Sequence, residues 1–141
     1  MAEQMSEDVW RAFILQGTRT GKLSTTRADG SPHITPMWFL MDGSDLMFTT
    51  EKKTVKGYNL LRDERVALCV DDERPPYSFV MLRGRVEISE DPGLLLTWAT
   101  DIAARYMGQE RAREFGERNS VSGMLLGRMR IEHVAAYAAI A

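Results

Sequence analysis

The sequence predicts an α+β domain, mainly antiparallel β, whose strands form a barrel with helices at its edge. Many short strand-like runs are separated by tight turns, and the dipeptides Asp29-Gly30 and Asp42-Gly43 are strong hairpin signals. Only three or four helical segments occur, whereas a doubly wound parallel sheet needs a helix after nearly every strand. The sequence contains neither G-x-G-x-x-G nor G-x-x-x-x-G-K-[ST], so a nucleotide would have to bind through another fold.

The first half of the chain predicts one helix and three strands. Ser6 caps a helix that runs to about Leu15 and ends at Gly17. Residues 21–50 then predict three strands joined by tight turns. In the second of these strands both alternating sets of side chains are partly apolar, which is typical of a barrel wall covered on its outer side. Pro36 within this strand has no N–H to donate, so it predicts an edge strand, a bulge or a ligand-facing gap.

The second half predicts three helices set between strands. The expected elements are a helix at 54–62, a strand at 65–72, a long strand at 77–89, a helix starting at Asp91-Pro92, a helix at 110–118 and one or two final strands. The long strand alternates apolar and charged residues, so one of its faces belongs to the core. Asp91 supplies a helix cap and Pro92 a preset first turn. The helix at 110–118 is charged all round and is expected to be solvated.

Length and composition limit the architecture and the function. A chain of 141 residues predicts a single domain over 1–141, with a helix in 1–17 and the barrel with its inserted helices in 21–141. A net charge of −2 provides no basic field for nucleic acid. No apolar run approaches the length of a membrane span, and the acidic N-terminal segment is unlike a secretion signal. The single Cys69 predicts a buried, inert thiol, and we expect a cytoplasmic protein without disulfides.

The stretch "LMFTTEKKTVKGYNLLRDERVAL", residues 46–68, places hydroxyl and ammonium groups where a strand passes into a helix. The first turn of a helix has free N–H groups and partial positive charge, which favour a phosphate. Thr54 stands at the cap position, Lys56 lies in the first turn, and Thr50 ends the strand. Lys52 and Lys53 add charge in the connecting loop. The pattern predicts either an anion site or a solvated loop with a threonine cap.

The segments "DGSPHITPMWFL", "LMFTT", "TVKGYNLLRDERVAL" and "SFVMLRGRVEI" occur in an order and spacing that resembles the pyridoxamine phosphate oxidase-like split β-barrel family. The sequence is most similar to the actinobacterial branch that uses the deazaflavin coenzyme F420 rather than FMN. The resemblance covers about 21–140. It implies a six-stranded antiparallel split β-barrel of the FMN-binding type, with peripheral helices. It also implies a homodimer with its cofactor sites at the subunit interface.

Carried over by position, the resemblance implies a set of cofactor-binding residues. They are Pro36, Met37, Trp38, Thr49, Thr50, Lys52, Lys53, Thr54, Lys56, Asn59 and Tyr77. Asn59 lies three residues after Lys56 and so on the same helix face. Met37 and Trp38 are also compatible with the core or the dimer interface. The family places an aromatic of the second chain beside the cofactor, and Tyr77 would be that aromatic.

One departure from the family bears on the choice of cofactor. The flavin oxidases carry an arginine before the lysine of this helix, and this chain has Val55 there. Loss of a charge-assisted contact weakens the case for FMN, whereas Lys52 and Lys53 suit the acidic oligoglutamate tail of the deazaflavin. Arg83 and Arg85 share one strand face and either supply charge to a partner subunit or are solvated.

The resemblance implies a coenzyme F420-dependent oxidoreductase. Such an enzyme transfers a hydride from the reduced deazaflavin to a small unsaturated, conjugated or quinone-like acceptor, while the protein binds and orients. No catalytic acid or base stands out. The alternatives are an FMN-dependent oxidase or reductase of the same fold, a non-catalytic flavin, deazaflavin or haem-binding protein, and a purely structural dimer. His33, at a strand start, is expected to be a turn or surface residue, and His133 is expected at a bend. They form no metal pair with each other, and neither is a persuasive haem ligand.

Overall fold

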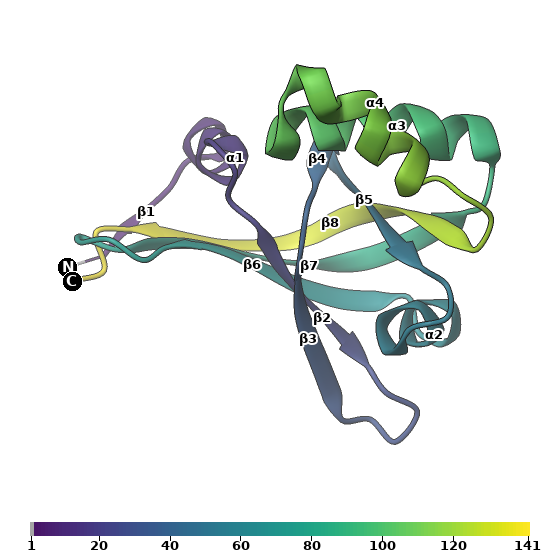
Figure 1. The fold of residues 1–141 in the computed structure, drawn as a ribbon. Coiled ribbons are helices and arrows are strands. Elements are labelled where there is room, and N and C mark those ends of the chain that lie inside the picture. The colour runs from purple at the N-terminus through teal and green to yellow at the C-terminus, as the bar shows by residue number, and fades with distance from the viewer. Residues whose placement is uncertain (1) are drawn as a thin grey trace.

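The computed structural model describes residues 2–141, so residue 1 of the expected N-terminal segment lies outside it. The described chain is a mixed α+β domain with an antiparallel sheet (Figure 1). Its elements are β1 (Glu3–Gln4), α1 (Glu7–Leu15), β2 (Gly21–Thr26), β3 (Pro32–Met37), β4 (Leu40–Asp42), β5 (Asp45–Glu51), α2 (Val55–Arg62), β6 (Arg65–Asp72), β7 (Ser78–Ser89), α3 (Pro92–Met107), α4 (Gln109–Arg118) and β8 (Met124–Ala138). The strand order is β3-β2-β6-β7-β8-β5-β4, and β1 pairs with β8. The predicted fold class is confirmed.

The described sheet has eight strands where six were expected. The two additional strands are short: β1 has two residues and β4 has three. β4 is separate because the expected second strand breaks at Trp38 and Phe39. There the N–H of Phe39 donates to the hydroxyl of Tyr106 (3.2 Å). The Phe39 carbonyl accepts from Arg105 (2.8 Å). These contacts with α3 take the backbone out of the sheet for two residues.

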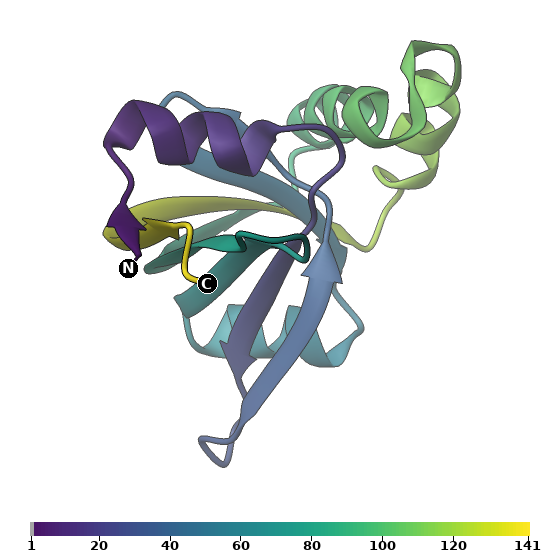
Figure 2. The same ribbon diagram turned by 90° about the vertical axis from the view of Figure 1, so that its left-hand side faces the viewer.

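The sheet curls on itself because its two end strands are consecutive in the chain. β3 pairs only with β2 and β4 only with β5, and two residues join β3 to β4. The edge-strand interpretation of Pro36 is therefore confirmed. α1 lies across one end of the curled sheet, whereas α3 and α4 lie together on another side (Figure 2). The core includes Trp10 and Ile14 of α1 together with Phe39 and Phe48.

The long pair β7–β8 contains an irregularity beside His133. Arg83 pairs with His133, but Gly84 pairs with Ile131, so one residue of β8 is left over. This bulge confirms the expected bend at His133. At Gly84 a Cβ would collide with the backbone carbonyl of Arg130, so glycine permits the close approach of the two strands.

Three expectations from the sequence need correction. α4 is not solvated all round, because Ala112 and Gly116 are buried, and a Cβ on Gly116 would meet Thr100 of α3. Cys69 is half-buried rather than buried, since it alternates with the core residues of β6; burial raises the pKa of its thiol. His33 lies at the start of β3, as expected, but it is half-buried rather than in a turn or on the surface, and its Nδ1 is enclosed without a hydrogen-bond partner. Within residues 2–141 we find no helix long and apolar enough to cross a membrane.

Candidate functional site

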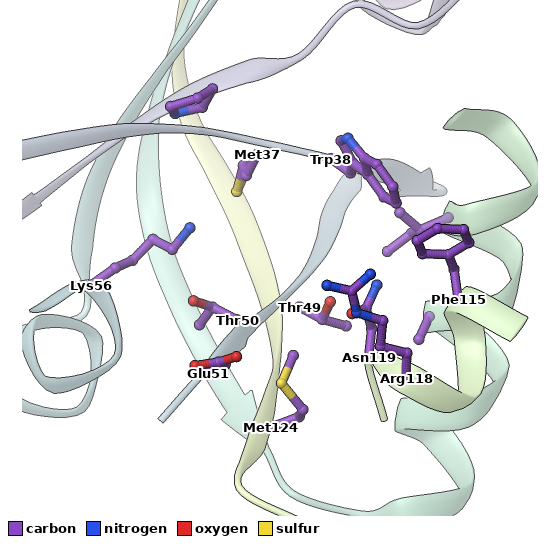
Figure 3. Close-up of a pocket in the computed structure, with 13 residues that line it drawn as sticks. Met37, Trp38, Thr49, Thr50, Glu51, Lys56, Phe115, Arg118, Asn119 and Met124 are labelled. Atoms are coloured by element: carbon purple, nitrogen blue, oxygen red, sulfur yellow. The ribbon is translucent and has the colours of Figure 1, made fainter. Parts of the chain in front are cut away.

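A cavity of about 460 Å³ lies between β5, the β3–β4 break, α2 and the α3–α4 pair (Figure 3). Its volume falls within the usual range for small-molecule sites, roughly 300–1,000 Å³. Six of the residues expected from the sequence line it: Pro36, Met37, Trp38, Thr49, Thr50 and Lys56. The structure therefore brings together residues from β3, the β3–β4 break, β5 and α2 that are up to twenty positions apart in the sequence.

One side of the cavity is formed by Lys56 and Thr50. Lys56 is the second residue of α2, and its ammonium group points into the cavity (Figure 3). Burial lowers the pKa of Lys56, and among residues 2–141 no carboxylate lies within 4 Å of it. Thr50, only 7% exposed, lies beside it on β5. A half-buried cation without a counter-ion is unfavourable in itself, so this corner favours an anionic ligand.

The start of α2 is closed by its own loop. The hydroxyl of Thr54 accepts from the N–H of Gly57 (3.0 Å) and donates to the carbonyl of Glu51 (2.8 Å). Gly57 packs so closely on the Glu51 and Lys52 carbonyls that a Cβ would not fit. Thr54 does not line the cavity. The Lys56 side chain, rather than the free N–H groups expected from the sequence, therefore gives this corner its positive charge.

The remaining predicted residues lie elsewhere. Lys52 pairs with Glu90 (3.4 Å) outside the cavity, and Lys53 borders an adjoining groove. Asn59 is 3% exposed; it donates to Thr25 Oγ1 (3.0 Å), within the fold. Tyr77 lies in the turn before β7, and its carbonyl accepts from Ile140 N (3.0 Å) near the C-terminus. Within this chain, none of these four contributes to the cavity wall.

The opposite side of the cavity has an aromatic wall. Trp38 stacks on Tyr106 with ring centres 5.1 Å apart and planes within 3°. Phe115 meets Trp38 edge-on at 6.2 Å. The Tyr106 hydroxyl donates to the Arg19 carbonyl (2.7 Å), and burial raises the pKa of this phenol. Tyr106 thus holds Trp38 in place from the side of α3.

Arg105 ties the same helix to the barrel. Its guanidinium donates to the carbonyls of Ile14 (2.9 Å), Gly17 (2.9 Å) and Phe39 (2.8 Å). Burial lowers its pKa. Carbonyl oxygens satisfy the donors of this arginine, so α3 is fixed to the end of α1, to the segment after it and to the β3–β4 break.

Sequence reasoning missed the residues that the α3–α4 pair and the start of β8 bring to the cavity. They include Phe115, Arg118, Asn119 and Met124, and Glu51 at the end of β5 was missed as well. A local signal existed for two of them, because Phe115 and Arg118 are three positions apart and so share a helix face. Nothing local indicated that this face turns toward the β3–β4 break. That placement depends on how α4 packs on α3.

The chain belongs to the pyridoxamine 5'-phosphate oxidase family, whose model matches residues 6–136. No curated protein sequence matches the chain significantly. The conserved hypothetical protein Rv2991 of Mycobacterium tuberculosis superposes with a TM-score of 0.83 at 27% identity, covering 96% of this chain and 86% of that one. The structure of an F420 reductase gives a TM-score of 0.70 at 27% identity, covering 87% and 94%.

The same fold also occurs in the haem storage protein HutZ of Vibrio cholerae. That structure has a TM-score of 0.75 at 15% identity and covers 94% of this chain and 96% of its own. At this identity the likeness concerns the fold alone. Together the matches establish the split-barrel family that the sequence resembles, and they include one protein named for the deazaflavin.

Proposed function

We propose that the protein is a coenzyme F420-dependent oxidoreductase that reduces a small unsaturated, conjugated or quinone-like acceptor. The observation that carries the proposal is the half-buried Lys56 without a counter-ion, beside Thr50 and across the cavity from Trp38. An ammonium group and a hydroxyl suit a phosphate, and an aromatic wall suits a flat ring. The relative named as an F420 reductase, at 27% identity, supports the choice of cofactor.

The chain's own residues would bind, orient and exclude water. Lys56 and Thr50 would hold the cofactor phosphate, and the strand segment from Pro36 to Trp38 would contact the ring. When bound, the deazaflavin supplies the hydride chemistry, as is usual for cofactor enzymes. Trp38 and Phe115 would shield the acceptor from bulk water on the α4 side. Among the described residues that line the cavity there is neither a histidine nor a cysteine, so a haem would find none of its usual axial ligands in this part of the chain.

Val55 offers a test of cofactor choice. It is the first residue of α2, 47% exposed, and precedes Lys56. Val55→Arg would restore a second cation next to the proposed phosphate. We expect FMN affinity to rise about 10-fold, the scale of one charge-assisted contact. A titration that finds no gain over the wild type would discard Val55 as the reason for the preference.

We also propose that the chain forms a homodimer through the outer face of the sheet. By register, Ile34, Ser24, Ala67 and Arg83 form one row across β3, β2, β6 and β7. Ile34 is 63% exposed, and the two residues in the middle of the row are small. Ala67→Arg would place a bulky charge in this row. Sedimentation should find a dimer for the wild type and a monomer for the variant; a monomeric wild type would refute the arrangement.

The decisive experiment is a paired titration of the apoprotein with coenzyme F420 and with FMN, followed by fluorescence. We expect micromolar or tighter binding of F420 and much weaker binding of FMN. Lys56→Ala should weaken the affinity for F420 about 10-fold or more. Lys52→Ala changes a lysine in the loop before α2, outside the cavity, and should leave the affinity nearly unchanged. Preference for FMN would transfer the protein to the flavin enzymes. Binding of neither cofactor would end the proposal.

A further inference from the structure

The cations near the cavity differ from most others in the chain because they lack partners. Within the described residues 2–141, Lys53, Lys56, Arg83 and Arg118 have neither a carboxylate within 4 Å nor a side-chain hydrogen bond. Lys56 lines the cavity, Lys53 lines the adjoining groove, and Arg118 lines both. Three of these four unpaired cations therefore lie around one hollow, and the fourth, Arg83, lies on β7 away from it.

Arg118 is the exception within its own helix. Arg111 of α4 pairs with Glu114 (3.1 Å), and Arg113 pairs with Glu117 (3.0 Å). The guanidinium of Arg118 instead points into the cavity (Figure 3). A favourable interaction with the C-terminal end of α4 would account for an arginine at this position, but it would not require the side chain to point into the cavity.

Arg118 and Lys56 approach the cavity from opposite sides, with Thr49 and Thr50 of β5 between them (Figure 3). A phosphate held by Lys56 would therefore leave Arg118 without a counter-ion. The guanidinium carbon of Arg118 lies 5.6 Å from the centre of the Phe115 ring. The subsite thus combines a fork of N–H donors with the aromatic wall of Trp38 and Phe115, an arrangement that matches a carboxylate attached to a planar group.

We propose that Arg118 forms a second anion-binding subsite at the α4 end of the cavity. It takes a carboxylate, and the aromatic wall takes the planar group that carries it. Asn119, the next residue, lines the same space and adds an amide donor. The subsite itself follows from the geometry; only its assignment to the acceptor rests on the proposed function. The acidic tail of a bound deazaflavin is the other source of a carboxylate.

The first test needs no cofactor. The apoprotein is titrated with 2-naphthoate and with the uncharged 2-naphthamide, and quenching of tryptophan fluorescence reports binding near Trp38. We expect the wild type to prefer the carboxylate about 10-fold and Arg118→Gln to lose the preference. Arg113→Gln, the same change on the same helix at an arginine paired with Glu117, should retain it. Equal binding of both probes, or a preference lost in Lys56→Ala but kept in Arg118→Gln, would overturn the subsite.

The second test separates the two sources. Coenzyme F420 and a deazaflavin truncated after the phosphate are titrated into wild type and Arg118→Gln. Unchanged F420 affinity, together with the lost naphthoate preference, assigns the carboxylate to the acceptor. If Arg118→Gln lowers the affinity for F420 about 10-fold or more, but not the affinity for the truncated form, the carboxylate belongs to the tail of the deazaflavin. A wild type that binds neither deazaflavin nor FMN but prefers naphthoate would end the proposed function and leave the subsite standing.

Discussion

The contact between Tyr106 and the β3–β4 break permits a quantitative prediction. Tyr106→Phe removes one hydroxyl and keeps the ring that stacks on Trp38. The hydroxyl donates to the carbonyl of Arg19 (2.7 Å) and accepts from the N–H of Phe39 (3.2 Å). The substitution therefore isolates two hydrogen bonds from the aromatic packing.

The two lost bonds differ in their consequences. The Arg19 carbonyl still receives a donor from Arg105 (3.4 Å). Phe39 is fully buried, and its N–H would be left without that partner. An unsatisfied buried donor costs about 1–3 kcal/mol, so we expect Tyr106→Phe to reduce the free energy of unfolding by about 2 kcal/mol. For a chain of this length that corresponds to a Tm lower by about 7 °C.

Urea unfolding followed by circular dichroism, at one fixed protein concentration, measures the change. Tyr58→Phe is the matched control because Tyr58 is 56% exposed on α2; it should change the free energy by less than about 0.5 kcal/mol. The emission of Trp38 should also shift if the β3–β4 break loosens. If Tyr106→Phe is as stable as the control, the hydroxyl does not fix the break, and the account of why the second strand is interrupted is wrong.

Two further predictions concern the sheet and the cavity. Gly84→Ala should lower the free energy of unfolding by about 2 kcal/mol or more, because its Cβ would meet the Arg130 carbonyl. The control is Gly93→Ala, whose Cβ would make an ordinary contact at 3.4 Å. In the same unfolding assay it should stay within about 1 kcal/mol of the wild type. Affinity for F420 should be full at neutral pH and fall as pH rises through the lowered pKa of Lys56, below its usual 10.5, because only the protonated amine attracts phosphate. Lys56→Arg should hold its affinity across about pH 7–10, and an identical decline in both proteins would exclude Lys56 as the titrating group.

Sequence reasoning predicted the features of the fold that depend on neighbouring residues. The helix caps at Ser6, Thr54 and Asp91 are all present, each accepting from a backbone N–H three residues on. The break between β3 and β4 was not predictable in this way. It depends on Tyr106, 67 positions from Phe39, and a single sequence carries no local signal of such a contact.

For the site, the same distinction holds. Thr49, Thr50 and Lys56 follow one another closely and share the cavity. The sequence cannot show that the Thr54 hydroxyl is used within its own loop, because the spacing suits a helix cap and a ligand equally well. Arg118 escaped notice because α4 reads as a solvated helix until its packing on α3 is known.

The two helices between β7 and β8 differ in what they contact. α3 contacts the barrel through Arg105 and Tyr106. Substitutions at these residues therefore lower the stability of the fold before they alter which ligand the cavity binds. α4 packs chiefly on α3 and presents Phe115 and Arg118 to the cavity. During evolution, the cavity side of α4 can therefore vary with little effect on folding, much as loops vary on a rigid scaffold. We expect paralogues of this chain to diverge in what they bind at this helix, while the barrel and α3 stay as they are.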